Sequence, residues 1–216
     1  MHSRDLIEQY KTYVQDWRRY FHKHPELSNE EFETTKTLAK ELESMGVEVH
    51  VDEERGTGLI GIIHGEKTGK AIALRADIDA LPVQEHNTFD FKSDVDGKMH
   101  ACGHDGHMAI LLGAAKMLTS MKDRIEGDVY LAFQPAEETG AGAPDFMKFG
   151  DWFEKVDAIF GGHVWIDLPA GLISVEEGPR MAASSKITIN VKGKQGHGAQ
   201  PHQAVDAIVV ASAIVM

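Results

Sequence analysis

The sequence predicts an α/β fold, in which a mostly parallel mixed sheet is flanked by helices and is followed by the start of a smaller α+β domain. Segments with helical periodicity alternate with apolar, strand-like segments over the first part of the chain, a pattern typical of an α/β domain with a largely parallel sheet. Near residue 180 the pattern changes to strict alternation of apolar and polar residues, which indicates an antiparallel sheet with one solvated face. We therefore place one domain at residues 1–180 and a second at residues 181–216.

Two helices and a strand are predicted at the start of the chain. Apolar and aromatic residues recur with a helical period over residues 5–22, and Pro25 ends this helix. Asn29 is placed to cap a second helix that runs to Gly46, a suitable residue for the left-handed turn after a helix. Residues 47–51 then alternate like a half-buried strand.

The middle of the chain supplies the central strands. Residues 59–63 and 71–74 are densely apolar, as expected for strands that are covered on both faces. Residues 78–103 show no periodicity, and a loop of this length inside a compact domain is usually functional or disordered. The remaining elements of this part are a helix at 107–121, a strand at 129–133 and a strand that begins at 158.

The rest of the chain, from residue 172 through the second domain, is predicted from shorter signals. Residues 172–175 form a short strand, and residues 186–192 alternate strictly between polar and apolar. A glycine-rich loop at 193–199 and a helix from about Pro201 follow them. The apolar run 207–216 is expected to be part of a helix that continues.

Composition and charge exclude several classes of protein. The chain has 22 Lys and Arg against 34 Asp and Glu, a net charge of −12, and one cysteine. A single cysteine excludes a scaffold of internal disulfides, and the absence of a basic block argues against nucleic-acid binding. The longest apolar run is about half the ~20 residues that a membrane span needs. The N-terminus lacks the apolar core of a signal peptide, so we expect a cytoplasmic protein.

The strongest chemical motif is MHACGHDGH, residues 99–107. Cys102 and His104 are two positions apart, which points both side chains the same way if this loop is extended. Thiolate and imidazole are good ligands for zinc-like ions. The competing interpretation is a buried cysteine beside loop histidines.

Two adjacent acids, Glu137 and Glu138, follow the strand 129–133. Adjacent carboxylates at such a place are unfavourable unless a cation or a proton relieves them. They point in different directions, so one is free to bind a metal while the other acts as a general base. A solvated helix N-terminus, where acids are also favoured, is the alternative.

Two further groups follow predicted strands. His163 comes after two glycines, and Asp77 and Asp79 lie in the segment RADIDALP. Each also has a simpler interpretation, a core histidine and a salt-bridged loop respectively. Together, however, these groups gather near the carboxyl ends of parallel strands, where open α/β sheets bind ligands. The set provides the ligands and the spare carboxylate of a metallohydrolase.

Six segments resemble those of a known family: FHKHPELSNEE, RADIDALP, MHACGHDGHMA, FQPAEE, GGHVW and GKQGHGAQPH. They resemble the amidohydrolase branch of the two-metal aminoacylase/carboxypeptidase superfamily, which includes hippurate hydrolase and hydrolases of indole-acetyl amino acids. They occur in order along almost the whole chain. The resemblance implies a metal-dependent enzyme that uses a metal-bound water to cleave the amide bond of N-acyl or N-aroyl amino acids or of small peptides.

The resemblance also implies a role for each residue. Two divalent ions (Zn, Mn, Ni or Co) are implied, with the Cys102 thiolate as the bridge between them and with four ligands in all: Cys102, His104, Glu138 and His163. Glu137 is implied as the general base, and Asp77 as support for the metal site. His197, in a lid domain, is implied to reach the active site, often that of the partner subunit, and to steady the oxyanion.

The family further implies a homodimer formed through the lid domain and a late metal-binding histidine that this chain does not contain. Members of the family are longer. We therefore expect the chain to be an N-terminal portion with a truncated lid, one that binds metal weakly and shows little turnover by itself.

Three alternatives remain open. Cys102 as a nucleophile, with His104 or His107 as its base, explains the single cysteine but gives the two acids and His163 no role. A metal-binding or dimerisation module without activity fits the truncated lid. A dinucleotide site at residues 139–142 lacks the third glycine of that motif.

Overall fold

The computed structural model describes residues 3–183, 185 and 187–216. The chain forms two compact units, Met1–Ser174 and Val175–Met216, and each is described by itself. Among the described residues, no helix combines the length and the apolar character needed to cross a membrane.

The first unit is built on a five-stranded sheet in the order β1-β2-β4-β3-β5. Its strands are β1 (Glu48–Val51), β2 (Leu59–His64), β3 (Ile72–Asp77), β4 (Asp128–Gln134) and β5 (Ala158–Gly161). β4 and β5 both pair with β3 in parallel, whereas β1–β2 and β2–β4 are antiparallel.

The predicted mixed α/β sheet is confirmed, but half of its pairings are antiparallel rather than most being parallel. The reason lies in the connection between β1 and β2. Residues 52–58 are too few for a parallel crossover, which takes a dozen residues or more, so β2 turns back beside β1.

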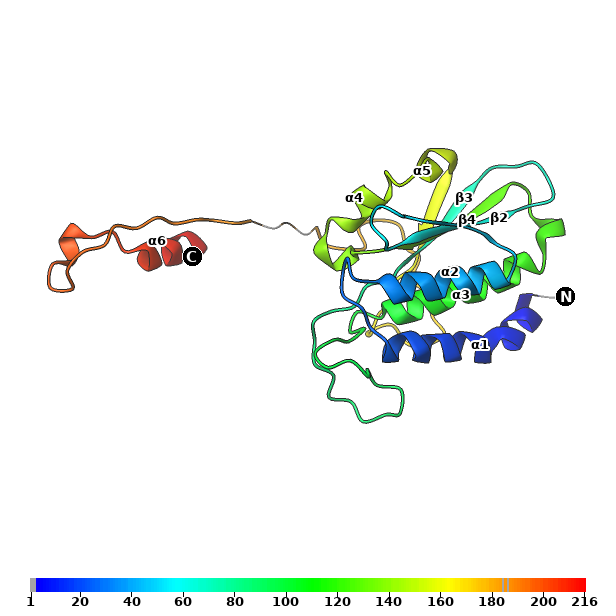
Figure 1. Ribbon diagram of the computed structural model, residues 1–216, viewed down its shortest axis with the longest axis horizontal. Helices are drawn as coiled ribbons and strands as arrows, with labels where there is room; N and C mark the ends of the chain where they lie inside the picture. The colour runs from blue at the N-terminus through cyan, green and yellow to red at the C-terminus, as the bar shows by residue number, and fades with distance from the viewer. Residues whose placement is uncertain (1–2, 184, 186) are drawn as a thin grey trace. The chain divides into compact units, whose positions relative to one another are not determined.

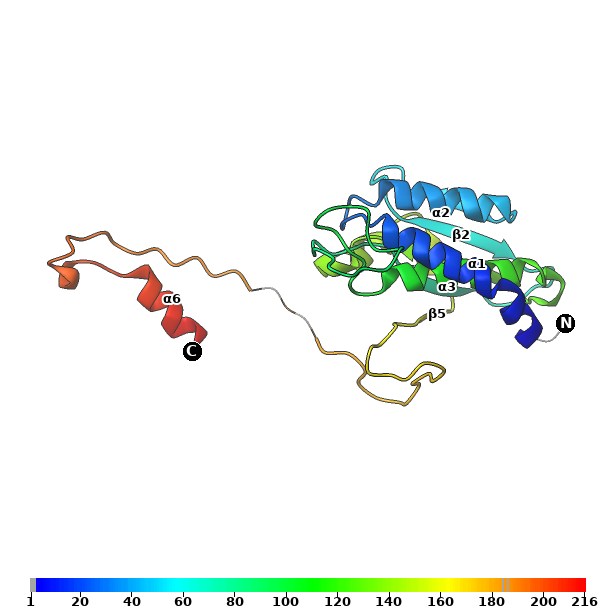
Figure 2. The same cartoon turned by 90° about the horizontal axis from the view of Figure 1, so that it is seen from below.

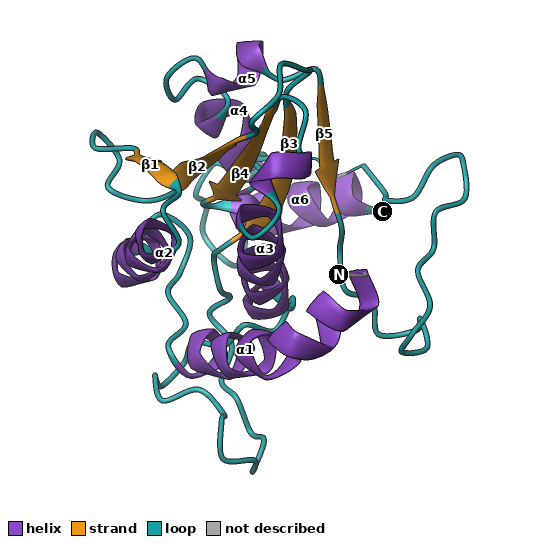
Figure 3. Cartoon of the chain, turned by 90° about the vertical axis from the view of Figure 1, so that its right-hand side faces the viewer, coloured by secondary structure: helices purple, strands orange, loops and turns teal. Residues whose placement is uncertain are grey.

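Helices cover both faces of the sheet (Figures 1 and 3), and Figure 2 views the first unit from the face that the long helices cover. The long helices α1 (Ser3–Lys23), α2 (Phe32–Ser44) and α3 (His104–Thr119) lie on one face, and the short α4 (Gly142–Phe146) and α5 (Trp152–Lys155) lie on the other. The larger core fills the first face, where fully buried side chains such as Leu42, Leu112 and Leu131 pack together. A smaller core around Ile60 and Trp152 fills the second.

A substitution in the larger core provides a test of this packing. Ile63 is fully buried in β2, and Ile63→Val is expected to lower the free energy of unfolding by about 0.5–1.5 kcal/mol, because it removes one buried methyl group. Ile110 is 56% exposed on α3, so Ile110→Val is a matched control that stays within about 0.5 kcal/mol of the parent. Urea unfolding measures both, and equal effects would contradict the assigned burial.

The parallel strands position the site. Because β3, β4 and β5 run in the same direction, the segments that leave their carboxyl ends emerge at one edge of the sheet. α3 begins at this edge with His104, three residues earlier than predicted. The loop between Cys102 and His104 is not extended, because Gly103 is left-handed with φ 87°, yet ligand atoms of the two side chains still lie within 4.8 Å of each other. A left-handed turn of this kind favours glycine.

The second unit is formed from few regular elements. It contains the short 3₁₀ helix η3 (Pro201–Gln203) and the helix α6 (Ala207–Val215), which together replace the helix expected from about residue 201. The Asp206 carboxylate caps α6 by accepting hydrogen bonds from the N–H groups of Ile208 and Val209 at 2.8 and 3.4 Å.

The two strands predicted in this region are wrong for the described residues. Residues 172–175 and 187–192 are not strands; Lys186 lies outside the described residues. An alternating pattern becomes a strand only when a neighbouring segment satisfies its backbone groups. Over the described part of this unit, the only pairing is an isolated bridge between Lys194 and Val205.

Two further 3₁₀ turns, η1 (Lys122–Arg124) and η2 (Glu137–Thr139), belong to the first unit.

Candidate metal centre

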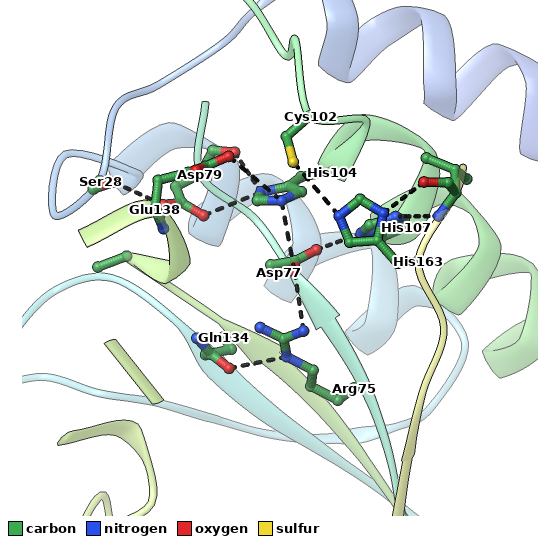
Figure 4. Close-up of polar contacts among 12 residues, drawn as sticks. Ser28, Arg75, Asp77, Asp79, Cys102, His104, His107, Gln134, Glu138 and His163 are labelled. Atoms are coloured by element: carbon green, nitrogen blue, oxygen red, sulfur yellow. Dashed lines mark hydrogen bonds and ion pairs between the residues drawn. The ribbon is translucent and has the colours of Figure 1, made fainter. Parts of the chain in front are cut away.

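Metal-ligating side chains from four separate elements meet at the carboxyl edge of the sheet (Figure 4). Asp77 and Asp79 lie at the end of β3, and Cys102, His104 and His107 lie at the start of α3. Glu137 and Glu138 follow β4, and His163 follows β5. Three overlapping groups place one ligand atom of each member within 4.8 Å of the others: Cys102–His104–His163, His104–Glu137–Glu138 and Asp77–His104–His107.

His104 lies at the centre of the site and is fully buried (0% exposed). Its Nδ1–H donates to the backbone oxygen of Asp79 at 2.8 Å, which leaves the lone pair on Nε2. That Nε2 lies 3.8 Å from Oε1 of Glu138. Both atoms are buried without a hydrogen-bond partner among the described residues.

Leaving such buried atoms unpartnered costs about 1–3 kcal/mol each. The imidazole lone pair and the carboxylate oxygen that faces it both donate electron pairs, so a divalent cation bound between them would give each atom a partner. The residues present therefore fit a metal ion. The hydrogen bond from Nδ1 of His104 to the Asp79 backbone oxygen is also typical of metal sites, because proteins usually orient a metal-binding imidazole through its other ring nitrogen.

Cys102 and His163 form the other side of the site. The Cys102 Sγ lies 3.5 Å from Nε2 of His163, and the His163 Nδ1–H donates to the backbone oxygen of Val164 at 2.6 Å. This contact leaves the lone pair of His163 on the nitrogen that faces the sulfur, as a ligand pair requires (Figure 4).

Asp77 lies beneath the site and is buried (1% exposed). Its Oδ2 contacts Arg75 Nη1 at 3.0 Å and lies 3.6 Å from His104 Nε2, and its Oδ1 accepts from His107 Nδ1. Burial opposes ionisation, but the His107 hydrogen bond and the nearby His104 and Arg75 side chains lower the pKa of Asp77 well below its usual range. Asp77 is therefore an anion that holds two histidine rings and one arginine in place.

His107 supports the site rather than adding a ligand. Its Nδ1 is engaged by Asp77, and its Nε2 accepts a hydrogen bond from the Val164 N–H at 3.0 Å. Both ring nitrogens are thus occupied. The second contact ties the start of α3 to the segment that carries His163.

The structure brings together six of the seven residues named from the sequence: Asp77, Cys102, His104, Glu137, Glu138 and His163. The seventh, His197, lies in the second unit, where its Nδ1 accepts a hydrogen bond from the Ala199 N–H at 3.2 Å. Sequence reasoning did not give roles to Asp79 and Arg75 and considered His107 only as a base for Cys102. The sequence does contain a signal that could have placed His107 in the site: His104 and His107 are three residues apart, and residues at this spacing share one face of a helix.

The thiol of Cys102 is not activated by its protein surroundings. Burial, followed by the negative charge of Glu138, raises the pKa of Cys102 to about 12. A cysteine nucleophile requires the opposite shift, toward a thiolate near neutral pH. The site therefore disfavours the cysteine-nucleophile alternative, whereas a divalent cation would offset the acidic surroundings.

A thiol, imidazoles and carboxylates at the carboxyl edge of a mixed sheet define a metallohydrolase-type α/β domain. A family model described as peptidase family M20/M25/M40 matches residues 73–214. The chain belongs to this family, which confirms the resemblance inferred from its motifs.

Curated relatives of the chain include amide-hydrolysing enzymes. The chain is 42% identical over 210 residues to an N-acyl-L-amino acid amidohydrolase of Geobacillus stearothermophilus, covering 97% of this chain and 56% of that protein. It is 45% identical to an N-acetylcysteine deacetylase of Bacillus subtilis, covering 95% of this chain and 54% of that protein. The chain thus spans about half the length of these relatives.

Solved structures agree on the fold. A dinuclear metal-binding peptidase of the M20 family from Bacillus subtilis is 46% identical, with a TM-score of 0.76 over 80% of this chain and 48% of that one. A putative aminohydrolase from methicillin-resistant Staphylococcus aureus is 37% identical, with a TM-score of 0.78 over 99% of this chain and 58% of that one.

Proposed function

We propose that the protein is a metal-dependent amidohydrolase that cleaves the amide bond of N-acyl or N-aroyl amino acids or of small peptides. The observation that carries the proposal is the pair of buried, unpartnered ligand atoms, His104 Nε2 and Glu138 Oε1, which face each other at 3.8 Å. Membership of the M20 family and the names of the amidohydrolase relatives support it.

The proposed residues for two divalent ions are Cys102, His104, Glu138 and His163. When bound, such ions supply Lewis acidity that activates a water and polarises the substrate carbonyl. The two histidines keep their lone pairs on Nε2 because each Nδ1–H donates to a backbone oxygen. Asp77 holds a negative charge 3.6 Å from Nε2 of His104, which would favour a bound cation.

Glu137 is the proton carrier of the proposed reaction. Its carboxylate lies in one group with His104 and Glu138, so it faces the same space without being needed as a ligand. One of its oxygens accepts a proton from the attacking water and later delivers that proton to the leaving amine nitrogen. A positioned acid–base group of this kind contributes about 10²–10⁴-fold to a rate.

Two parts of the proposal concern the second unit and the location of the protein. His197 donates a hydrogen bond to the developing oxyanion, a role that the family resemblance of the segment GKQGHGAQPH implies. The whole protein forms a homodimer through its lid domain, which begins in residues 181–216, and is cytoplasmic. The mass of the purified protein in solution, measured by light scattering, tests the dimer.

Removal of metal tests the proposed activity. Since this chain is expected to show little turnover by itself, the test uses the whole protein to which it belongs. We expect that protein, once purified, to release free amino acid from N-acetyl or N-benzoyl amino acids, to lose this turnover on chelation, and to regain it with Zn²⁺ or Mn²⁺, because only bound cations satisfy the buried ligand atoms. Amino-acid release and metal content by mass spectrometry are the measurements. Turnover that survives full chelation, and is then lost when the thiol is alkylated, would establish Cys102 as a nucleophile instead.

A further inference from the structure

Glu31, directly before α2, carries a fully buried carboxylate (0% exposed). Its Oε1 accepts a hydrogen bond from the backbone N–H of Ala136 at 2.8 Å, across 105 positions of the chain. Its Oε2 is buried without a hydrogen-bond partner among the described residues. Burial of a carboxylate is expensive compared with an apolar side chain of similar volume, so the packing of α2 does not account for an acid at this position.

The partner of Glu31 has an unusual backbone conformation. Ala136 has φ 55° and ψ 38°, a left-handed conformation that costs a non-glycine residue about 1–3 kcal/mol. Both of its backbone polar groups are held, because its N–H donates to Glu31 and its carbonyl accepts from the Thr139 hydroxyl at 2.8 Å. The strained turn is thus fixed from both sides.

The turn at Ala136 determines where the next two residues lie. Glu137 and Glu138 follow it at once, and their carboxylates meet His104 within 4.8 Å. The N–H of Glu138 donates to Asp79 Oδ2 at 3.0 Å. A right-handed backbone at Ala136 would redirect the chain and withdraw both acids from His104.

We propose that Glu31 is a positioning residue: by holding Ala136 in its left-handed conformation, it fixes the Glu137 and Glu138 carboxylates relative to His104. This inference rests on the proposed function, because it takes Glu138 as a metal ligand and Glu137 as the proton carrier. It adds a residue that lies far away in sequence and contacts neither substrate nor metal.

The rest of the α1–α2 connection braces the same region. The Ser28 hydroxyl donates to Asp79 Oδ2 at 2.7 Å, and the Ala80 N–H donates to the Glu26 carbonyl at 2.8 Å. This connection therefore contacts both the segment after β3 and the segment after β4. Burial raises the pKa of Glu31 above its ordinary value, so a neutral amide is a conservative replacement there.

Three substitutions at Glu31 test the inference by metal affinity, measured by competitive titration with Zn²⁺. Glu31→Met removes the acceptor at nearly the same length and is expected to weaken the affinity about 10–100-fold, the usual effect of losing a group that orients a ligand. Glu31→Gln keeps an acceptor oxygen and is therefore expected to keep a Zn²⁺ affinity close to that of the parent. Glu31→Asp draws the carboxylate back from Ala136 and weakens binding as Met does, which decides the question if the Met variant does not fold.

A matched control and a rescue separate positioning from general stability. Glu30 is exposed and pairs with Lys98 at 3.1 Å, so Glu30→Met is expected to leave the Zn²⁺ affinity unchanged. Glycine adopts the left-handed conformation without support, so adding Ala136→Gly to Glu31→Met is expected to recover part of the lost affinity. No recovery would overturn the assigned route through Ala136.

Kinetics separate this inference from the proposed function. In metal-saturated protein, Glu31→Met is expected to lower kcat about 10–100-fold with KM little changed, because Glu137 is misplaced while the substrate pocket is intact. Unchanged Zn²⁺ affinity and kcat in a protein that hydrolyses amides would refute the role of Glu31 alone. Weakened Zn²⁺ affinity in a protein without amide hydrolysis would uphold Glu31 as a positioning residue of the metal site and refute the proposed activity.

Discussion

Glu137→Gln is expected to lower the rate of amide hydrolysis by about 10²–10⁴-fold, because the amide cannot carry a proton from water to the leaving amine. The metal content should not change, since the proposed ligands do not include Glu137. Gln has nearly the same shape, so the stability of the fold is also preserved. Steady-state kinetics, together with metal analysis of the same samples, measures both quantities.

Two comparisons sharpen this test. Glu138→Gln replaces the buried oxygen that faces His104 at 3.8 Å, so it is expected to lower metal content as well as rate. Glu43→Gln, at an exposed position on α2, should change neither. Equal rates for Glu137→Gln and the parent would remove Glu137 as the proton carrier and favour a metal-binding module without catalysis.

His22→Leu is expected to lower the free energy of unfolding by about 3–5 kcal/mol, the usual loss when one member of a buried charge network is removed. His22 is buried (2% exposed) and bridges two carboxylates, with Nδ1 2.7 Å from Asp105 and Nε2 3.1 Å from Glu85. Arg18 still contacts Asp105 at 3.0 Å, but Glu85 loses its histidine. Urea unfolding measures the loss.

The control for this substitution is nearby on the same chain. His24 is exposed, and its Nδ1 donates only to the backbone oxygen of Tyr20. His24→Leu is therefore expected to stay within about 0.5 kcal/mol of the parent, as surface substitutions usually do. A similar loss for both variants would show that the network around His22 contributes nothing particular.

The contribution of His22 also depends on pH. Burial lowers its pKa, but the hydrogen bonds to Asp105 and Glu85 prevail, so the pKa lies above the ordinary value of 6.5. A raised pKa stabilises the folded state fully below the unfolded value and loses this effect as pH rises through the folded value. The difference in stability between the parent and His22→Leu should therefore shrink from mildly acidic toward alkaline pH.

The convergence of the site residues was predictable from the sequence. Each group follows a predicted strand or begins the helix between two strands, and parallel strands end at one edge. The ligand types, thiol, imidazole and carboxylate, then indicate the chemistry without coordinates. What the pattern could not supply is the local geometry, such as the left-handed Gly103 that moves the start of α3 to His104.

Other features depend on contacts that no local pattern encodes. The link between Glu31 and Ala136 joins residues 105 positions apart, and nothing near Glu31 in sequence announces it. The expected strands do not form at 172–175 or over the described residues 187–192, and the reason is the opposite one. Their alternation is a local property, but a strand requires a partner segment, and the pattern does not say whether one exists.

The strand order β1-β2-β4-β3-β5 has a consequence for how the molecule folds. The candidate ligands lie between Cys102 and His163, and they approach one another only when β4 and β5 have both docked beside β3. Such non-local parallel pairings close long loops and slow the folding of a chain. An ion that binds only this late arrangement stabilises it by mass action, by about 2.7 kcal/mol at a free concentration one hundred times its Kd. A supply of metal ions is therefore expected to raise the yield of folded protein, in addition to its part in the chemistry.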